Sequence, residues 1–348
     1  MSKFILSNYI EPVFLKTNEM SCNSSTFKKN GKRYFISRNV TYFISKNTSA
    51  LLDGRYHTRN FLYEIDDDGT LHFIKEMNTL NASNNCRYFG LEDVRTITWE
   101  DKVYFSCTKV LGNTDAATMC FGEIDDNLNF VNIKEYPTNV KREKNWAPIE
   151  SMPFTYIYSF SPFKIVNIQE RRMYDGPSYF NVKFSGSSPV IEYKDKLLAL
   201  VHTKTRDWQY HHYFILMDKD LKPIKISEPF TFFGNKTEFC VDVKLHNDKI
   251  CIMSSVNDGL SYMFEIDDSM LERILNKDLT DNNSKTNVYD RFLNDSLKMN
   301  APEFISLQAL YANNKLNIAE AIVLNHDKSR LPFYKKADIQ RKLLEKLK

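Results

Sequence analysis

The chain has 348 residues, which is long enough for two domains or for one large β architecture with an appendage. Its 47 basic and 44 acidic side chains leave a net charge of +3, so no strong field favours nucleic acid or an anionic membrane. Only 10 residues are Gly, and neither GxGxxG nor GxxxxGK[ST] occurs, which excludes the common glycine-rich nucleotide cradles. Aromatic residues make up 14% of the chain, a share that favours strands.

The N-terminus, the apolar runs and the cysteines indicate a cytoplasmic protein without a membrane span. The first residues carry one Lys and a broken apolar run without a small-residue cleavage site, unlike a signal peptide. The longest apolar runs, such as Leu197–Val201, fall far short of the roughly 20 residues that cross a bilayer. The 6 cysteines are scattered without any CxxC, so we expect free thiols in a reducing compartment.

Along the chain, a degenerate repeat places an Asp-rich turn after an apolar strand. In three of its four copies another hydrophobic strand precedes at a short distance, and each such pair predicts an antiparallel hairpin. The four copies are FLYEIDDDGTL (61–71), FGEIDDNL (121–128), YFILMDKDL (213–221) and MFEIDDSML (263–271).

The spacing of these turns indicates the architecture. The turn residues Asp66, Asp125, Asp218 and Asp267 are separated by 59, 93 and 49 residues, and the long middle gap contains a further strand pair in Thr155–Ile168. Units of about 45–60 residues, each a small antiparallel sheet, are typical of propeller blades. We therefore predict an all-β fold in which residues 1–270 form a five-bladed β-propeller.

The texture changes in the last part of the chain, where apolar residues recur at helical intervals in segments such as PEFISLQALYANNKLNIAEAIVL. Residues 271–348 are therefore predicted to form a helical C-terminal extension. We expect it to cap the propeller or to mediate a homo-oligomer rather than to act as a separate functional module.

Two patterns that resemble metal sites are better explained by structure. Asp66–Asp68 and Asp218–Asp220 match the DxD pattern of metal-dependent glycosyltransferases, but the same acids recur in hairpin after hairpin, where Asp favours turns. His211 and His212 are adjacent, so in a strand they face opposite sides and cannot share a metal. We expect neither a metal nor a cofactor.

The string GLEDVR places Glu92, Asp93 and Arg95 in an otherwise apolar stretch just ahead of a strand. Charges in such a place must be paired or used. A nearby Arg holds a carboxylate ionised, whereas burial would raise the carboxyl pKa and suit it to proton donation. An ion pair that pins the edge of a blade is the alternative.

Two further strings could contact a ligand. EKNW combines a cation, an amide and a large aromatic face in Lys144, Asn145 and Trp146, a combination that commonly grips sugars. A loop salt bridge with a core Trp is the alternative. FSGSSPVI contains Ser187 in a small-residue turn, where the backbone can approach a ligand closely.

Seven strings occur in a fixed order along the chain: GLEDVR, EKNWAPIE, YIYSF, SGSSPVI, YHHYFILMD, ISEPF and EFC. Between about residues 30 and 270 the chain thereby resembles the five-bladed propeller proteins related to glycoside hydrolase family 130 (β-mannoside phosphorylases) and glycosyltransferase family 108 (β-mannosyltransferases). It looks most like a glycosyltransferase-like branch of them.

The resemblance implies inverting glycosyl transfer on β-mannosides, with a sugar phosphate or nucleotide sugar as donor and a glycan as acceptor. Asp93 matches the acidic residue of the family's EDPR string and would be the general acid/base, although Val94 replaces the usual Pro. Basic residues would stabilise the phosphate charge in place of a metal.

The remaining predicted site residues would bind the substrate around a central funnel. Glu92 and Arg95 would orient Asp93 and contact the sugar, and Asp258 is all that remains here of the family's YGAAD string. The full predicted set comprises Arg59, Glu92, Arg95, Lys144, Asn145, Trp146, Ser187, His212, Glu238 and Asp258.

Two other functions stay open from the sequence. An inverting glycosidase would use a second carboxylate to activate water across the sugar ring. A non-catalytic propeller would bind glycans without turnover, but the Asp93 string together with basic residues argues against binding alone.

Overall fold

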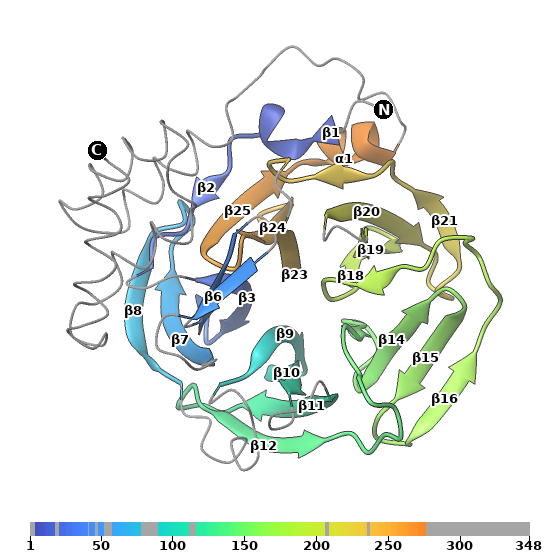
Figure 1. The fold of residues 1–348 in the computed structure, drawn as a ribbon, viewed down its shortest axis with the longest axis horizontal. Helices are drawn as coiled ribbons and strands as arrows, with labels where there is room; N and C mark the ends of the chain where they lie inside the picture. The colour runs from blue at the N-terminus through green and yellow to red at the C-terminus, as the bar shows by residue number, and fades with distance from the viewer. Residues whose placement is uncertain are drawn as a thin grey trace.

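The computed structural model describes residues 4–17, 21–40, 42–45, 48–51, 58–77, 90–110, 116–205, 209–234 and 237–275. Its strands form a propeller-like ring of antiparallel sheets, seen along the shortest axis in Figure 1. The prediction of an all-β propeller is thereby confirmed at the level of the ring.

Four sheets have four strands each, and in each of them the strands follow one another from the ring axis to the periphery. The first sheet consists of β3 (Cys22–Lys29), β4 (Lys32–Val40), β7 (Thr58–Ile65) and β8 (Leu71–Glu76). The second consists of β9 (Glu92–Trp99), β10 (Lys102–Val110), β11 (Ala117–Ile124) and β12 (Phe130–Glu135). The third consists of β13 (Ala147–Pro148), β14 (Thr155–Phe160), β15 (Phe163–Asn167) and β16 (Arg172–Asp175). The fifth consists of β23 (Glu238–His246), β24 (Lys249–Val256), β25 (Leu260–Ile266) and β2 (Val13–Phe14).

The fourth sheet is larger and irregular. Its inner edge consists of two short strands that both pair with β19, and residues 187–190 separate the two. Its seven strands are β17 (Ser185–Gly186), β18 (Ile191–Tyr193), β19 (Lys196–Lys204), β20 (Tyr210–Met217), β21 (Pro223–Ile226), β22 (Phe230–Thr231) and β1 (Phe4–Ile5). The ring thus has four regular blades where the sequence predicted five, and this larger sheet fills the remaining sector.

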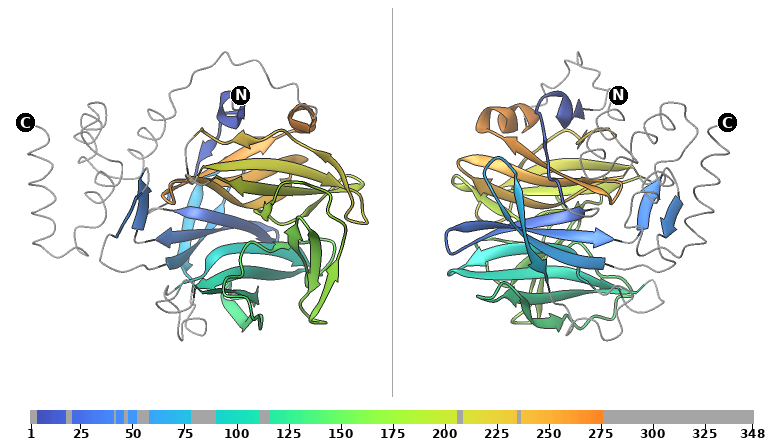
Figure 2. Two further views of the ribbon diagram at one scale, coloured as in Figure 1. Left: turned by 45° about the vertical axis from the view of Figure 1, so that its right-hand side comes forward. Right: turned by 90° about the vertical axis from the view of Figure 1, so that its left-hand side faces the viewer.

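The N-terminal segment ties the ring together. β1 pairs in parallel with β22, the short 3-10 helix η1 (Leu6–Asn8) follows, and β2 then pairs with β25, Val13 opposite Met263. Figure 2 shows this segment beside α1 on one side of the ring. A separate hairpin of β5 (Tyr42–Ser45) and β6 (Thr48–Leu51) leaves the first sheet between β4 and β7.

The predicted hairpins and their Asp-rich turns are confirmed. Oδ1 of Asp125 accepts a hydrogen bond from the Asn129 amide at 2.7 Å, and Oδ1 of Asp218 accepts one from the Lys222 amide at 2.8 Å. Asp267 uses the same chemistry differently, because its Oδ1 accepts from the Met270 amide and caps α1 (Asp268–Leu275). These acids stabilise the turns and the helix start through hydrogen bonds to nearby backbone amides.

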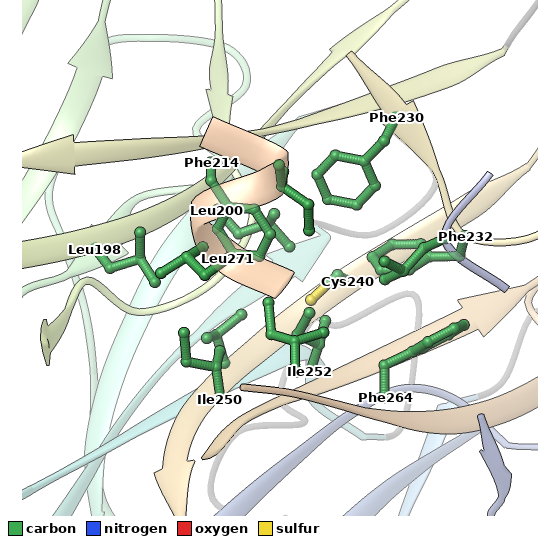
Figure 3. Packing of buried hydrophobic residues seen from close by; sticks show 14 of the residues in the cluster. Leu198, Leu200, Phe214, Phe230, Phe232, Cys240, Ile250, Ile252, Phe264 and Leu271 are labelled. Atoms are coloured by element: carbon green, nitrogen blue, oxygen red, sulfur yellow. The ribbon is translucent and has the colours of Figure 1, made fainter. Parts of the chain in front are cut away.

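The largest hydrophobic cluster lies between the fourth and fifth sheets. Figure 3 shows Leu200 and Phe214 of the fourth sheet gathered with Ile252 and Phe264 of the fifth and with Leu271 of α1. The first turns of the C-terminal extension are therefore helical and packed on the ring. The predicted helices beyond residue 275 lie outside the described residues, and the boundary at residue 270 stays a prediction. No helix in the described ranges is long and apolar enough to cross a membrane.

Candidate active site

The polar strings predicted from the sequence lie where the inner strands begin. Glu92 and Asp93 open β9, and Glu238 opens β23. Asn145 comes just before β13, and Ser187 follows directly after β17. Because the inner strands lie around one axis, corresponding ends of these strands gather at one end of it. The hydrogen bonds of Arg95, described below, join Asp93, Asn145 and Ser187.

Asp93 is the centre of this cluster. Its side chain is only 7% exposed, and Oδ1 accepts hydrogen bonds from Nδ2 of Asn23 at 2.8 Å and from Nη1 of Arg38 at 3.1 Å. Oδ1 of Asn23 accepts in turn from the Ser255 hydroxyl at 2.6 Å, so residues of the first and fifth sheets hold the carboxylate. Asp93 and Asn23 both have positive φ, at 55° and 45°, which Asp and Asn tolerate better than other side chains.

Glu92 links two cations beside Asp93. One carboxylate oxygen contacts Nζ of Lys144, and the other lies 3.5 Å from Nη2 of Arg38. Arg38 therefore pairs with both carboxylates of the GLEDVR string.

The pKa of Asp93 lies below its ordinary value of 3.8. Burial alone raises this pKa, but the positive charges of Arg38, Lys144 and Arg95, together with the Asn23 hydrogen bond, outweigh burial. The carboxylate is thus ionised at neutral pH. Of the two opposing effects weighed from the sequence, the nearby positive charges therefore outweigh burial in the unliganded protein.

Arg95 is fully buried and joins three sheets. Its Nε donates to the Ser187 carbonyl at 2.7 Å, its Nη1 to the Asp93 carbonyl at 2.9 Å, and its Nη2 to Oδ1 of Asn145 at 3.3 Å. Its predicted role in orienting Asp93 agrees with these bonds. They do not show it touching a sugar, because its donors already bind the protein.

Two further cations, Arg142 and Lys204, act electrostatically near Lys144, which itself contacts Glu92. Burial lowers the pKa of Lys204, and the positive charges of Arg142 and Lys144 lower it further, so the three lie near one another. Nζ of Lys204 lies 5.5 Å from the ring centre of Tyr210, and Asp258 acts on both of these residues electrostatically. Asp258 therefore lies within electrostatic reach of Lys204 and Tyr210, and its role in binding a substrate stays a prediction.

The small-residue turn brings two sheets together. A Cβ on Gly186 would lie 2.5 Å from the Asn145 carbonyl oxygen, so only Gly permits this approach. Ser187 is fully buried and its hydroxyl shares a hydrogen bond of 2.7 Å with Nδ1 of His202. Burial, followed by the charges of Arg95 and Lys204, lowers the pKa of His202 to about 3, so this imidazole is neutral. The group that approaches this turn closely is thus the Asn145 backbone and not a ligand. The Ser187 carbonyl holds Arg95 in position by accepting its hydrogen bond.

The structure corrects the prediction for Trp146 and gives Glu238 a structural role. Trp146 is 1% exposed and packs between Phe121 and Tyr158, so its ring supports the loop that carries Lys144 and cannot stack on a sugar. Glu238 is completely buried and accepts hydrogen bonds from the amides of residues 232 and 233, which orders the start of β23.

His212 and Arg59 are corrected as well. His212 is completely buried, 4.6 Å from the ring centre of Phe232, and burial holds its pKa well below the ordinary value. It therefore lies in the core. Arg59 belongs to β7, two strands from the axis, where its Nε and Nη2 donate to Glu76 at 2.8 and 2.6 Å.

Sequence reasoning missed Arg38 and Asn23, the two residues that touch the Asp93 carboxylate. Arg38 carries a usable signal, because Ser37-Arg38-Asn39 is a polar triplet inside the buried strand β4. The triplet TRN (residues 58–60), which contains Arg59, supports the site through Asn60 instead. Oδ1 of Asn60 accepts a hydrogen bond from the Leu91 amide at 2.7 Å, and its Nδ2 donates to the Leu91 carbonyl at 3.1 Å. Asn60 thus fixes the entry into the GLEDVR string.

No protein-family model and no curated protein sequence matches this chain. Its fold matches a β-1,2-mannobiose phosphorylase from Listeria innocua with a TM-score of 0.56 and 14% identity, over 77% of this chain and 93% of that one. A glycosyl hydrolase from Bacteroides ovatus matches with a TM-score of 0.54 and 12% identity, over 76% of this chain and 94% of that one. A GDP-Man-dependent mannosyltransferase from Leishmania mexicana matches with a TM-score of 0.50 and 13% identity, over 74% and 89%. The chain therefore shares the propeller fold of mannoside phosphorylases and of this mannosyltransferase, as its sequence strings implied.

Proposed function

We propose that the protein is a carbohydrate-active enzyme that transfers a glycosyl group, with inversion, between a sugar phosphate or nucleotide sugar and a glycan acceptor. The observation that carries this proposal is an ionised, hydrogen-bonded Asp93 next to Arg38 and to Lys144, with the cations Arg142 and Lys204 acting in turn near Lys144. The shared fold supports mannose as the sugar, in a mannosyltransferase or a mannoside phosphorylase.

The chemistry is a single displacement at the anomeric carbon. In the direction of transfer, the Asp93 carboxylate accepts the proton of the acceptor hydroxyl while that oxygen bonds to the anomeric carbon. The bond to the phosphate oxygen breaks, and phosphate or nucleoside diphosphate leaves with the electron pair. Asn23 and Arg38 both bond Oδ1, which leaves Oδ2 to take the proton.

The three cations Arg142, Lys144 and Lys204 suit a phosphate or diphosphate better than water. A developing phosphate anion is stabilised by fixed positive charges, and Lys144 and Lys204 both reach solvent. When such an anion binds, it offsets the charges that depress the pKa of Asp93, so the acid form becomes more accessible in the presence of the substrate. The same residue can then serve as general acid in phosphorolysis.

Direct hydrolysis is less well supported by the contacts. A glycosidase of the inverting type needs a second carboxylate free to activate water across the sugar. Glu92, the neighbouring carboxylate, is engaged by Lys144 and Arg38. We assign Glu92 the role of holding these two cations in place.

We also count the seven-stranded sheet as the fifth blade of the propeller. Its strands β18 and β19 lie between the third and fifth sheets in the ring (Figure 1), and the Ser187 carbonyl at its inner edge accepts from Arg95. On this count every blade contributes to the assembly around Asp93.

The test is to incubate the protein with mannose 1-phosphate and, separately, with GDP-mannose, each with and without a β-mannoside acceptor. Release of phosphate or of GDP and elongation of the acceptor are measured, for the wild type, for Asp93→Asn and for the exposed-surface control Asp220→Asn. Phosphate release with elongation supports a phosphorylase acting in reverse, and GDP release supports a transferase. Turnover must disappear in Asp93→Asn and persist in Asp220→Asn, and inactivity with both donors contradicts mannosyl transfer.

A further inference from the structure

A cavity of about 570 Å³ lies between the second and third sheets. This volume falls within the range of small-molecule sites. Asp93 lies at the start of β9, whereas the cavity is lined by Ile97 near the end of that strand and by Tyr104 near the start of β10. The cavity is therefore at the other end of the second sheet from the Asp93 cluster.

Aromatic side chains form much of its wall. Tyr104 and Phe154 meet edge to face with ring centres 5.2 Å apart, and Phe121 and Tyr156 lie 4.8 Å apart on the neighbouring strands. Tyr104 and Phe154 are partly exposed, while Phe121 and Tyr156 are buried. An aromatic wall of this kind offers faces on which the C–H groups of a sugar ring can stack.

The backbone is irregular at this cavity. The pairing of β11 with β12 shifts register around Gly122, and Asn132 on the bulged side has a φ of 55°. A Cβ on Gly122 would lie 2.6 Å from the Phe105 ring, so Gly is required there. Phe154 has a φ of 59°, which is costly for a bulky side chain. Such strain persists where the surrounding structure fixes it, often at ligand sites.

The charges around the cavity cancel. Its lining contains two acids, Glu123 and Glu135, and two bases, Lys134 and Arg171, together with the amides of Asn132 and Gln169. Glu135 is paired with Lys109 at 2.5 Å. This rim offers hydrogen-bond donors and acceptors without a net field, so it suits a neutral, hydroxyl-rich ligand and not a phosphate or nucleotide.

We propose that this cavity is a second glycan-binding site, which holds a neutral oligosaccharide away from the reacting centre. The choice of a glycan among neutral polar ligands rests on the proposed function. Tyr104 and Phe154 provide the stacking faces, and the amides and charges of the rim bond the hydroxyls. The site anchors a longer acceptor and adds affinity without entering the chemistry.

The proposal is tested by calorimetric titration of mannotetraose into the full-length protein, in the presence of a saturating methylene phosphonate analogue of mannose 1-phosphate. This analogue occupies the Asp93 cluster if the proposed function holds, and it cannot transfer its sugar because a carbon replaces the bridging oxygen. The pocket variants are Tyr104→Ala and Phe154→Gly, the latter because Gly accepts the positive φ without strain. Tyr104→Phe keeps the ring, and Phe73→Ala removes an aromatic ring that is 51% exposed on β8.

We expect the wild type, Tyr104→Phe and Phe73→Ala to bind with similar affinity, and Tyr104→Ala and Phe154→Gly to bind at least tenfold more weakly. Equal affinity across all variants, or no binding to the wild type, overturns the second site. Donor turnover is measured in parallel on the same protein preparations without the analogue. Turnover without pocket-dependent binding overturns the second site alone, and pocket-dependent binding without turnover overturns the catalytic proposal alone.

Discussion

Nδ2 of Asn23 donates a hydrogen bond of 2.8 Å to Oδ1 of Asp93, which lies 70 positions further along the chain and in the next sheet. The Asn23 side chain is held from its other end by Ser255 of the fifth sheet. The orientation of the proposed acid/base carboxylate thus depends on hydrogen bonds that reach it from the first and fifth sheets.

Replacing Asp93 by Asn should remove turnover and leave sugar binding intact. A general acid or base contributes about 10²–10⁴-fold in rate, so we expect a loss of that size or more. Asn tolerates the φ of 55° and keeps the shape of the side chain, so the fold is retained. Turnover and calorimetric sugar affinity are measured on the same sample. Unchanged turnover would assign the chemistry to another residue.

Replacing Asn23 by Gly should lower kcat about tenfold or more, because the carboxylate loses the hydrogen bond that orients it. Gly accepts the φ of 45° at this position, so the backbone is preserved. Circular dichroism checks the fold, and kcat and KM are determined separately. An effect on KM alone would mean that Asn23 binds substrate instead of positioning Asp93.

Replacing Arg38 by Lys should move the acid limb of the transfer reaction to higher pH. The wild-type pKa of Asp93 lies below 3.8, because burial is outweighed by the charge of Arg38 and its neighbours. As the pH falls through that pKa, the base is protonated and activity is lost, and a less well-placed charge raises the pH at which this happens. The profile of kcat/KM against pH decides the matter, and an unshifted acid limb would contradict the pairing of Arg38 with Asp93.

The same shift makes a prediction about stability. Because the folded pKa of Asp93 is below the unfolded value, its ionised form stabilises the protein above the unfolded pKa. This contribution is lost as pH falls from about 3.8 through the lower folded pKa. Urea titrations from about pH 5 down to about pH 2, which span the unfolded pKa of a carboxyl and the range below it, should show a smaller acid-induced loss of stability in Asp93→Asn than in the wild type.

Replacing His212 by Phe should leave turnover unchanged and raise the free energy of unfolding by about 1 kcal/mol. Both ring nitrogens of His212 are buried without a hydrogen-bond partner among the described residues, in an aromatic environment. A strong loss of activity with an intact fold would restore His212 as a site residue. Thermal unfolding and turnover are the two measurements.

Local patterns in the sequence predicted most of the ring. Alternating apolar residues identify hairpins such as β24 and β25, and Asp125 and Asp218 mark the turns through hydrogen bonds to their own loops. These local patterns did not predict the short inner strands β17 and β18 of the fourth sheet. Their positions depend on contacts with residues distant in the chain, namely the loop at Asn145 and the strand β19.

The site was harder to predict, because a residue can reach Asp93 only if its strand lies close enough to the ring axis, which the sequence does not show. The triplets SRN and TRN look alike, yet Arg38 on the second strand reaches Asp93 whereas Arg59 on the third binds Glu76. The lowered pKa of Asp93 likewise depends on Arg38 and Lys144, which approach Asp93 only in the folded chain. The sequence suggested Trp146 as a surface on which a sugar could stack, but its ring is buried in the core.

The pairing of Val13 with Met263 has a consequence for how activity is acquired. Bringing together segments so distant in the chain is entropically expensive and comes late in folding. The same junction brings Ser255 to Asn23 and thereby aligns Asp93. We therefore expect the ring to close and the Asp93 carboxylate to become aligned in the same step of folding. A partly assembled ring then lacks the aligned acid/base.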